Sequence, residues 1–290
     1  MALSSVVPGR VQWDMLAPIF GHLAASVAGL LFVETLCMEL FLPALAPALE
    51  GLEATMGRAR LVAGITTLVS AVGVWGVGML FTVPALLRMQ RGKIQINRSL
   101  DMGALLQAMP LVVVNFLVGT ATVIMALLAL LPDRAFEWHA PPSMGRLARD
   151  VVVWPLVADV VFFYVHRWLH RNKAMYAMVH KVHHSWSAPV SLVAIYCHPL
   201  EHVLANLAPM VAGPLLCGSH VAAVAVYILL GLGQGAAVHS GYWICGDDGM
   251  HDEHHANFTV NFGITGLMDA LYGSYRLPAG AKATTADKQL

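Results

Sequence analysis

The chain has 290 residues, of which 58% are hydrophobic and 12% are charged, and its 17 Lys and Arg residues balance 17 Asp and Glu residues. An average soluble domain is about 25% charged, so this chain has too little polar surface for a single water-soluble globule, and its high hydrophobicity excludes a disordered chain. The zero net charge also argues against a nucleic-acid-binding protein, which would present a basic face.

The N-terminal half contains three long apolar segments. A helix of about 20 mostly apolar residues crosses a bilayer core. The first segment covers residues 15–33 and continues to residue 43. The second and third, residues 61–87 and 102–132, contain no Asp, Glu, Lys or Arg. We therefore predict a transmembrane helix in each segment.

The C-terminal half contains a shorter apolar segment and a long uncharged one. Residues 151–165 are predicted to form a fourth transmembrane helix, which carries Asp159. No formally charged residue occurs between Glu201 and Asp247, and Pro and Gly residues interrupt this stretch near its middle. The pattern predicts a re-entrant hairpin of two helices, at residues 199–215 and 219–238. The expected fold class is an all-α integral membrane protein with about four transmembrane helices and this hairpin.

Basic residues in the loops predict the orientation, because cytosolic loops of membrane proteins are enriched in Lys and Arg. One basic group lies between the second and third predicted helices and consists of Arg88, Arg91, Lys93 and Arg98. Another follows the fourth predicted helix and consists of Arg167, Arg171, Lys173 and Lys181. Two crossings separate these groups, so both are expected on the cytosolic side.

Histidines are concentrated in three short clusters in the C-terminal half. The clusters are His166-Arg-Trp-Leu-His170, His180-Lys-Val-His183-His184 and His251-Asp-Glu-His254-His255. Because a helix turns about 100° per residue, spacings of three and four place the rings of each cluster on one helical face. The clusters are therefore predicted to form a cytosolic, histidine-rich helical cap.

The number of clustered imidazoles indicates a site for two metal ions. Neutral imidazole is a good ligand for iron, zinc, copper and nickel, and a catalytic zinc ion takes about three protein ligands. Eight clustered histidines exceed what one ion can bind. His239, at the end of the last apolar segment, is a ninth candidate ligand, and His198 and His202 are further candidates.

Acidic and amide residues near the clusters are candidates to orient the imidazoles. A metal-bound imidazole usually donates its other N–H to a carboxylate or a carbonyl group. Asp159 lies seven residues before His166, about 20° away on the same helical face, and an acid inside a membrane segment is a functional candidate because it is costly to bury. The other candidates are Glu201, His202, Asp252, Glu253, Asn257, Asn261 and Asp269.

Aromatic residues near the clusters allow two interpretations. They fit an aromatic belt at the membrane surface and equally fit the wall of a substrate-binding site. The candidates for substrate binding are Tyr164, Tyr196, Tyr242 and Trp243, and Trp168 allows the same two interpretations.

The histidine clusters resemble those of a known family. The boxes HRWLH, HKVHH and HDEHH, with HSGY between the second and third, are similar to the fatty acid hydroxylase/sterol desaturase superfamily of membrane non-haem di-iron enzymes. The resemblance extends from about Asp159 to Gly273. Within it, Ala188-Pro189, Tyr196-x-His198-Pro199-x-Glu201 and His239-Ser-Gly-Tyr242 most resemble the C-4 methylsterol monooxygenase branch.

The resemblance implies a ligand set and a division of the chain. Nine histidines are expected to bind two non-haem iron ions, and His198 is a candidate tenth ligand. The nine are His166, His170, His180, His183, His184, His239, His251, His254 and His255. Residues 1–150 are expected to be membrane helices, 151–277 the catalytic domain and 278–290 a mobile tail.

The resemblance also implies a reaction. An unactivated C–H bond cannot be ionised by a side chain of accessible pKa, so the oxidant must come from a metal and O2. The expected activity is oxidation of a membrane lipid, with a sterol as the substrate. Fatty acid hydroxylation, another lipid hydroxylation and sterol desaturation are the alternatives within the superfamily. The expected location is the endoplasmic reticulum membrane, with the metal site facing the cytosol.

Electrons are expected to come from NAD(P)H through a cytochrome b5-type donor and its reductase. The basic residues Arg167, Arg171, Lys173 and Lys181 would offer an acidic donor a docking face. Two other classes remain open, a bis-histidine haem electron carrier and a metal transporter. Adjacent histidines do not suit the haem protein, and the ligands of a transporter would lie near the middle of the bilayer.

Overall fold

The computed structural model describes residues 11–94, 99–188, 190–244 and 248–278. Within these ranges the regular structure is helical, apart from one isolated antiparallel bridge between Lys93 and Tyr242. The predicted all-α fold is thus confirmed. Most of the predicted tail, residues 279–290, lies outside the described residues, and so does Arg98 of the first basic group.

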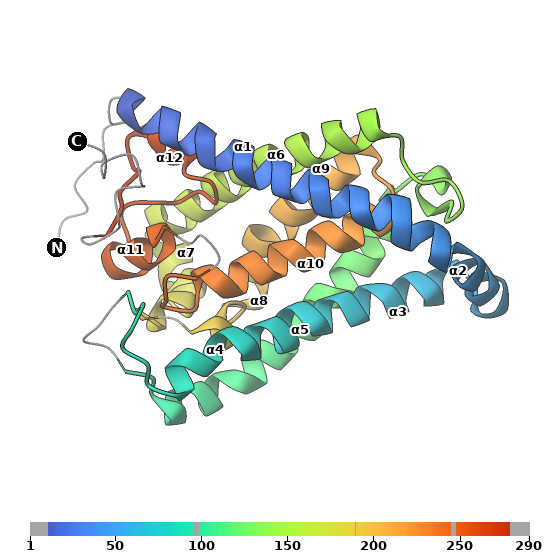
Figure 1. Cartoon of the computed structure of the whole chain (residues 1–290). Coiled ribbons are helices and arrows are strands. Elements are labelled where there is room, and N and C mark those ends of the chain that lie inside the picture. The colour runs from blue at the N-terminus through green and yellow to red at the C-terminus, as the bar shows by residue number, and fades with distance from the viewer. Residues whose placement is uncertain (1–10, 95–98, 189, 245–247, 279–290) are drawn as a thin grey trace.

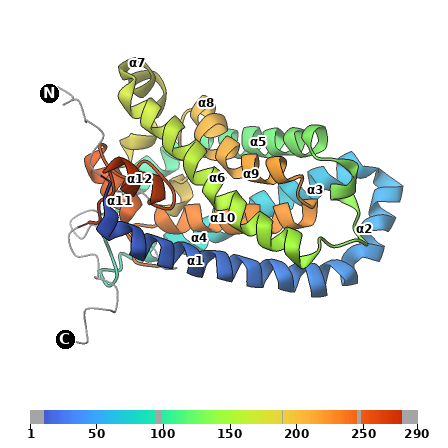
Figure 2. The same cartoon turned by 90° about the horizontal axis from the view of Figure 1, so that it is seen from above.

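The long helices run along one common axis (Figures 1 and 2). Helices α1 and α2 are linked by a π-helical turn, and so are α3 and α4; α8 and α9 are linked by another. Their bounds are α1 Trp13–Leu36, α2 Leu42–Met56, α3 Arg58–Ala71, α4 Gly78–Leu86, α5 Met102–Leu130, α6 Met144–Arg171, α8 Pro199–Glu201, α9 Ala208–Cys217 and α10 Val221–Val238.

Five helical segments among the described residues are long and apolar enough to cross a membrane. They are Trp13–Met56, Arg58–Leu86, Met102–Leu130, Pro199–Cys217 and Val221–Val238. The first three cover the predicted N-terminal helices, except that the second ends one residue and the third two residues before the predicted end. The last two are the arms of the predicted hairpin, and each has enough residues for a full crossing. Gly218 makes the turn between these arms in the left-handed conformation, with φ of 59°.

The predicted fourth membrane helix, residues 151–165, lies inside the longer helix α6, which is not one of these five segments. Helix α6 is amphipathic and contributes fully buried residues such as Trp154 and Phe163 to the bundle. It packs closely against α9, because a Cβ atom at Gly213 would lie 2.7 Å from the Cα atom of Trp154. Helix α6 therefore carries its histidines on a rigid, tightly packed support.

The remaining short helices gather at one end of the bundle. They are α7 Lys173–Met175, α11 Met250–Asn257 and α12 Leu267–Tyr272. Both views show α7, α11 and α12 at this end, together with the end of α4 that leads to the first basic loop (Figures 1 and 2). At the opposite end, Arg58 forms ion pairs with Glu53 at 2.9 Å and with Asp133 at 2.8 Å. The histidine clusters and the described residues of both predicted basic groups thus share one end.

Candidate metal centre

The nine predicted histidines converge into two groups of nitrogen atoms. In each group, one nitrogen per ring lies within 4.8 Å of every other. The first group is His166, His170, His180, His184 and His254, and the second is His183, His239, His251 and His255. His198, the candidate tenth ligand, belongs to neither group.

In each triple cluster the first and last histidines, which are four residues apart, share a group, whereas the middle histidine belongs to the other group. His180 and His184 lie in the first group and His183 in the second. His251 and His255 lie in the second group and His254 in the first. The three rings of each triple cluster, which were predicted to lie on one helical face, are therefore divided between the two groups.

The reason for this split is angular. Adjacent helical residues point about 100° apart, so His254 and His255 project from α11 towards different groups. Helix α11 therefore supplies rings to both groups. The backbone around the second cluster is not a regular α-helix, because a π-helical turn ends at His180 and a 3-10 turn begins at His183.

The Nε2 atoms of the first group are close together. Five Nε2–Nε2 distances among His170, His180, His184 and His254 lie between 2.8 and 3.2 Å. The ring of His166 is centred 4.5 Å from that of His254. Two nitrogens bound at right angles to one ion, each about 2.1 Å from it, would be about 3.0 Å apart, against about 3.4 Å at a tetrahedral angle. The first group thus fits a metal with more than four ligands.

The second group adjoins the first. The Nε2 atom of His251 lies 2.9 Å from that of His239 and 3.0 Å from that of His255. The ring of His183 is centred 4.7 Å from the ring of His255. The two groups meet where the ring centres of His184 and His255 are 5.0 Å apart. This arrangement suits two neighbouring ions.

Backbone carbonyl groups determine the tautomer of five rings. A carbonyl oxygen can only accept, so each Nδ1 atom that bonds to one carries the proton, and the lone pair of that ring is on Nε2. The Nδ1 donors and their carbonyl acceptors are His166 to Phe262 at 3.0 Å, His183 to Tyr196 at 3.3 Å, His239 to Gly235 at 2.7 Å, His254 to Val260 at 2.7 Å and His255 to Trp186 at 2.9 Å. The lone pairs of these rings therefore point into the two groups, where a cation would relieve their mutual repulsion.

Burial keeps the clustered imidazoles neutral. It lowers the pKa of His180, His239 and His254 to about 3, mainly because an imidazolium ion would lose its hydration there. Neighbouring histidines lower the pKa of His239 and His254 further. At neutral pH these rings are therefore in the form that binds metals.

Glu201 lies where an imidazole-orienting acid was predicted. Its Oε1 atom accepts a hydrogen bond from Nδ1 of His180 at 2.7 Å, and both side chains are buried. This contact sets the tautomer of His180 as the carbonyls do for the other rings, and it directs Nε2 into the first group.

Asp159 and Asp269 contact the backbone instead of an imidazole. The carboxylate of Asp159 accepts hydrogen bonds from the backbone N–H groups of Ile264, Thr265 and Met268 at 2.7 to 3.1 Å. The predicted contact of Asp159 with a metal-bound imidazole is therefore wrong. The physical reason is that the turn after Phe262 presents its own N–H groups to the face of α6 that carries Asp159.

Asp269 holds the beginning of the same turn. Its carboxylate accepts hydrogen bonds from the backbone N–H groups of Phe262 at 2.8 Å and Gly263 at 2.7 Å, and from the hydroxyl group of Ser274 at 2.7 Å. Because the carbonyl of Phe262 accepts the proton of His166 Nδ1, Asp269 acts on that ring through one intervening peptide unit.

The other predicted orienting residues have varied surroundings. Glu253 pairs with Arg276 at 2.9 Å, and Asn257 donates to Glu253 at 2.8 Å. Asn261 donates to the carbonyl groups of Met250 and Arg276 and so ties the chain segments around α11 together. Asp252 is buried and lines a pocket that is described below.

His198 and His202 lie outside the two groups. The Nδ1 atom of His198 accepts the backbone N–H of Leu200 at 3.2 Å and so caps the start of α8. His202 lies 3.1 Å from the amide nitrogen of Asn206 and packs against Gly119 of α5. The prediction of His198 as a tenth ligand is not supported, because its ring caps a helix. The prediction of His202 as an orienting residue is not supported either, because its ring packs between helices.

The predicted aromatic residues divide between the surface and the interior. Tyr164 is half-exposed on α6, and its hydroxyl lies 2.6 Å from that of Tyr272. Tyr196 packs in the apolar cluster that contains Tyr242, and Tyr242 donates its hydroxyl to the carbonyl of Met89 at 2.9 Å. Trp243 lies against Gly249 at the start of α11. Of these, Tyr242 lines a pocket.

One predicted member of the docking face is buried. The guanidinium group of Arg167 lies over the rings of Phe163 and Tyr272, 5.3 and 4.8 Å from their centres, and the residue is 7% exposed. It stabilises the packing of α6 on α12 and is not available to a partner, so its assignment to a docking face is wrong. Arg171 and Lys173, also predicted for that face, are exposed.

Sequence reasoning missed the backbone carbonyl groups that orient the rings. The acceptors belong to Trp186, Tyr196, Gly235, Val260 and Phe262. Every residue has a carbonyl group, so no residue type could have indicated these positions.

The segment that carries all nine histidines matches a described protein family. Residues 151–274 match the family model described as "Fatty acid hydroxylase". The chain is 33% identical over 144 residues to "Fatty acid hydroxylase domain-containing protein 2" of Homo sapiens, and this match covers 47% of this chain and 43% of the relative. It is 40% identical over 136 residues to "Fatty acid hydroxylase ahd1" of Mycosarcoma maydis, and this match covers 45% of this chain and 34% of the relative.

Sterol enzymes are also among the relatives. The chain is 33% identical over 144 residues to a putative methylsterol monooxygenase of Dictyostelium discoideum, which covers 46% of this chain and 53% of the relative. The chain thus spans about half or less of the length of these curated relatives. No solved structure matches it. The predicted resemblance to the fatty acid hydroxylase/sterol desaturase superfamily is confirmed.

Proposed function

We propose that the fatty acid hydroxylase domain of this chain is the catalytic part of a membrane-bound, non-haem di-iron monooxygenase that oxidises an unactivated C–H bond of a lipid. The catalytic domain comprises residues 151–277, and residues 1–150 supply membrane helices. The observation that carries this proposal is the convergence of nine imidazole nitrogens into two adjoining groups. A sterol is the substrate that the sequence motifs favour, and a fatty acyl chain is the alternative that the similarity to the fatty acid hydroxylase of Mycosarcoma maydis favours.

The donor set fits iron better than zinc. Zinc in proteins is almost always four-coordinate, whereas the first group contains five imidazoles with Nε2 atoms at distances typical of right-angle ligands. His166, His170, His180, His184 and His254 would hold one ion. His183, His239, His251 and His255 would hold the second and leave room for further ligands.

The bound irons would supply the activation of O2, which no side chain can provide. The chain contributes the surroundings. Buried carbonyl groups and Glu201 hold the ring protons on Nδ1, so that the rings do not rotate out of position. The apolar side chains of Phe258 and Phe262 pack on His184 and His170 and limit the access of water. A lipid would enter laterally from the bilayer between the apolar helices.

Electrons would arrive from NAD(P)H through a cytochrome b5-type donor. Arg171, Lys173 and Lys181 are exposed near the end of α6 that carries His170. Positive charge at this position would steer and orient an acidic donor. Charge reversal at Lys173 and Lys181 is expected to slow the reduction of the metal centre by such a donor and to leave reduction by dithionite unchanged.

We assign the protein to the endoplasmic reticulum membrane with its metal centre towards the cytosol. The positive-inside rule supports this orientation, since the loop after α4, which carries Arg88, Arg91 and Lys93, lies at the end of the bundle where α11 lies (Figure 1). The assignment to the endoplasmic reticulum follows from the family resemblance. Labelling of a single cysteine placed at Lys181 by a membrane-impermeant maleimide in sealed microsomes tests this orientation.

Metal analysis of the purified protein tests the central proposal. The protein would be purified in detergent, reconstituted with ferrous iron under anaerobic conditions and analysed by inductively coupled plasma mass spectrometry and Mössbauer spectroscopy. Two irons per chain and O2-dependent formation of a hydroxylated lipid would support it. One zinc ion per chain without bound iron would contradict it, and a Soret band would indicate the haem alternative.

A further inference from the structure

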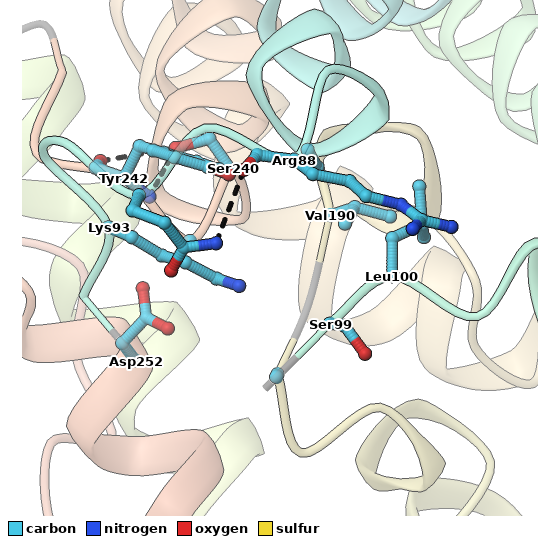
Figure 3. Close-up of a pocket in the computed structure, with 12 residues that line it drawn as sticks. Arg88, Lys93, Ser99, Leu100, Val190, Ser240, Tyr242 and Asp252 are labelled. Carbon is cyan, nitrogen blue, oxygen red and sulfur yellow. Dashed lines mark hydrogen bonds between the residues drawn. The ribbon is translucent and has the colours of Figure 1, made fainter. Parts of the chain in front are cut away.

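A pocket of about 220 Å³ lies beside the second histidine group. Two parts of the chain and two further residues line it. The lining residues are Ala85, Arg88, Gln90, Lys93, Ser99 and Leu100 from the first part, Ser240, Gly241, Tyr242 and Asp252 from the second, and Ala188 and Val190. Figure 3 shows Arg88 extending past Val190 and Leu100, with Lys93 and Asp252 on the side of Tyr242. No side chain predicted as a metal ligand lines this pocket.

Backbone hydrogen bonds fix the basic loop to the segment after His239. Ile94 donates to the carbonyl of Gly241 at 2.9 Å, and Trp243 donates to the carbonyl of Gly92 at 2.8 Å. The hydroxyl of Tyr242 donates to the carbonyl of Met89 at 2.9 Å. The rim of the pocket is thus built into the same piece of backbone that carries a candidate metal ligand.

The pocket combines apolar walls with excess positive charge. Ala85, Val190 and Leu100 provide apolar surface, and Arg88 and Lys93 provide two cations against the one carboxylate of Asp252. A guanidinium group binds a carboxylate or a phosphate through two parallel hydrogen bonds. The chemistry of the lining therefore matches an amphipathic molecule with an anionic end.

The pocket lies at the end of a candidate membrane span, where the surface of a membrane is expected. The candidate membrane span Arg58–Leu86 ends just before Arg88. Leu87 is 68% exposed, although it precedes three basic residues within six positions. An exposed leucine followed by cations is typical of the boundary between acyl chains and headgroups, where basic side chains reach towards the polar phase.

The pocket is also close to the candidate metal centre. Ser240 follows His239, and Asp252 follows His251, so lining residues and candidate ligands are consecutive in two places. Consecutive Cα atoms are 3.8 Å apart. A headgroup held in the pocket would therefore be anchored within a short distance of the second histidine group.

We propose that this pocket binds the anionic headgroup, a carboxylate or a phosphate, of the lipid substrate. The proposal rests on the proposed lipid oxidation and specifies its substrate class as a lipid with a negatively charged end. It therefore favours the alternative named above, a fatty acyl chain, over a neutral sterol. Arg88, on the side of Val190 and Leu100, binds the charge, and Lys93, on the side of Tyr242, adds positive charge to the pocket. Ala85, Val190 and Leu100 contact the first carbons of the chain. A pocket of this size between two backbone-linked segments suits a headgroup better than the flat surface of a protein partner.

Equilibrium binding to the metal-free protein in nanodiscs of neutral phosphatidylcholine tests this assignment. The probes are laurate, lauryl phosphate and the uncharged lauryl alcohol, which share one chain length. We expect the wild-type protein to bind one or both anions at least tenfold more tightly than the alcohol. The double variant Arg88→Gln/Lys93→Gln should lose at least tenfold in affinity for the preferred anion, because a hydrogen bond to a charged group is lost. Its affinity for the alcohol should change less than twofold.

The matched controls are Arg91→Gln and Arg88→Lys. Arg91 is exposed on the same loop but does not line the pocket, so its replacement should leave anion binding unchanged. Arg88→Lys keeps the charge and should retain most of the affinity. Retained alcohol binding shows that a variant is folded. Equal binding of all three probes by the wild-type protein, or unchanged anion binding by the double variant, would overturn the proposal.

A docking role would give a different result from a headgroup site. If the double variant bound the anions normally but was reduced more slowly by an acidic protein donor, the pocket would be a partner contact and our assignment would be wrong. Because the measurement uses metal-free protein and reads binding alone, its failure is distinguishable from a failure of the di-iron proposal, which is judged by metal content and turnover.

Discussion

Asp159 and Asp269 approach one glycine from two different helices. A Cβ atom at Gly263 would lie 2.8 Å from Oδ1 of Asp159 and 2.9 Å from Oδ2 of Asp269. Both carboxylates accept backbone N–H groups from the turn around this glycine. This turn also places the carbonyl of Phe262 where it accepts a hydrogen bond from Nδ1 of His166. Two acids and a glycine thus position one candidate ligand without touching it.

Replacement of one histidine from each group should remove one metal ion at a time. His254→Ala affects the first group and His251→Ala the second. We expect each variant to lose turnover and to bind about one iron per chain instead of two, since the other group is intact. Mass spectrometry of the metals measures this. The control is His202→Gln, a buried histidine outside both groups, which should retain two irons. Full metal content and activity in His254→Ala would contradict its role as a ligand.

Glu201→Gln should weaken metal binding without abolishing it. The carboxylate accepts the Nδ1 proton of His180 at 2.7 Å, and loss of such a partner typically costs 10- to 100-fold in metal affinity. The glutamine oxygen can still accept, so we expect a decrease of about tenfold. Competition with a chelator measures the affinity. An unchanged affinity would show that the contact only fills space.

Asp159→Asn should loosen the turn that follows Phe262. In the wild-type protein the two oxygens of the Asp159 carboxylate accept three backbone N–H groups. Asparagine has only one acceptor oxygen, so at least one of these hydrogen bonds is lost. Loss of a hydrogen bond to a charged group costs about 1.5–3 kcal/mol. We expect a lower melting temperature and a lower iron occupancy in the first group. An unchanged melting temperature and full occupancy would contradict the role of Asp159 in holding the turn.

Gly263→Ala should have an effect similar to that of Asp159→Asn. The added methyl group would collide with both carboxylates, so at least one acid must move. We expect reduced thermal stability and reduced binding of iron by the group that contains His166. Gly145→Ala is the matched control, because its Cβ atom would have no neighbour within 4 Å. If both variants behaved like the wild type, the close approach would be irrelevant to the site.

The metal-free protein should lose stability as the pH falls below about 6.5. Burial lowers the pKa of His180, His239 and His254 from 6.5 to about 3 in the folded state, so the unfolded state binds more protons between these values. Each of these three histidines then lowers the free energy of unfolding by about 1.4 kcal/mol per pH unit as the pH falls through this range. The melting temperature of the metal-free protein between pH 7 and 4 measures this effect. A flat profile would show that these rings are not buried in neutral form.

The sequence alone determined the properties that depend on composition and local spacing. Apolar segments predicted the long helices because crossing a bilayer requires a minimum apolar length. The spacing of four between His166 and His170, and between His251 and His255, determined which rings share a side, because the helical angle is a local property. The boxes also indicated the family that the comparison with known proteins supports.

The tertiary structure decided everything that depends on distances between elements. It separated His183 from His184 and His254 from His255, it directed Asp159 to the backbone, and it buried Arg167 between two rings. It also brought the basic loop at Lys93 against Tyr242. Spacing along a chain determines an angle around one helix axis, but the partner of a side chain depends on how helices pack, and a backbone carbonyl that accepts a proton can belong to any residue.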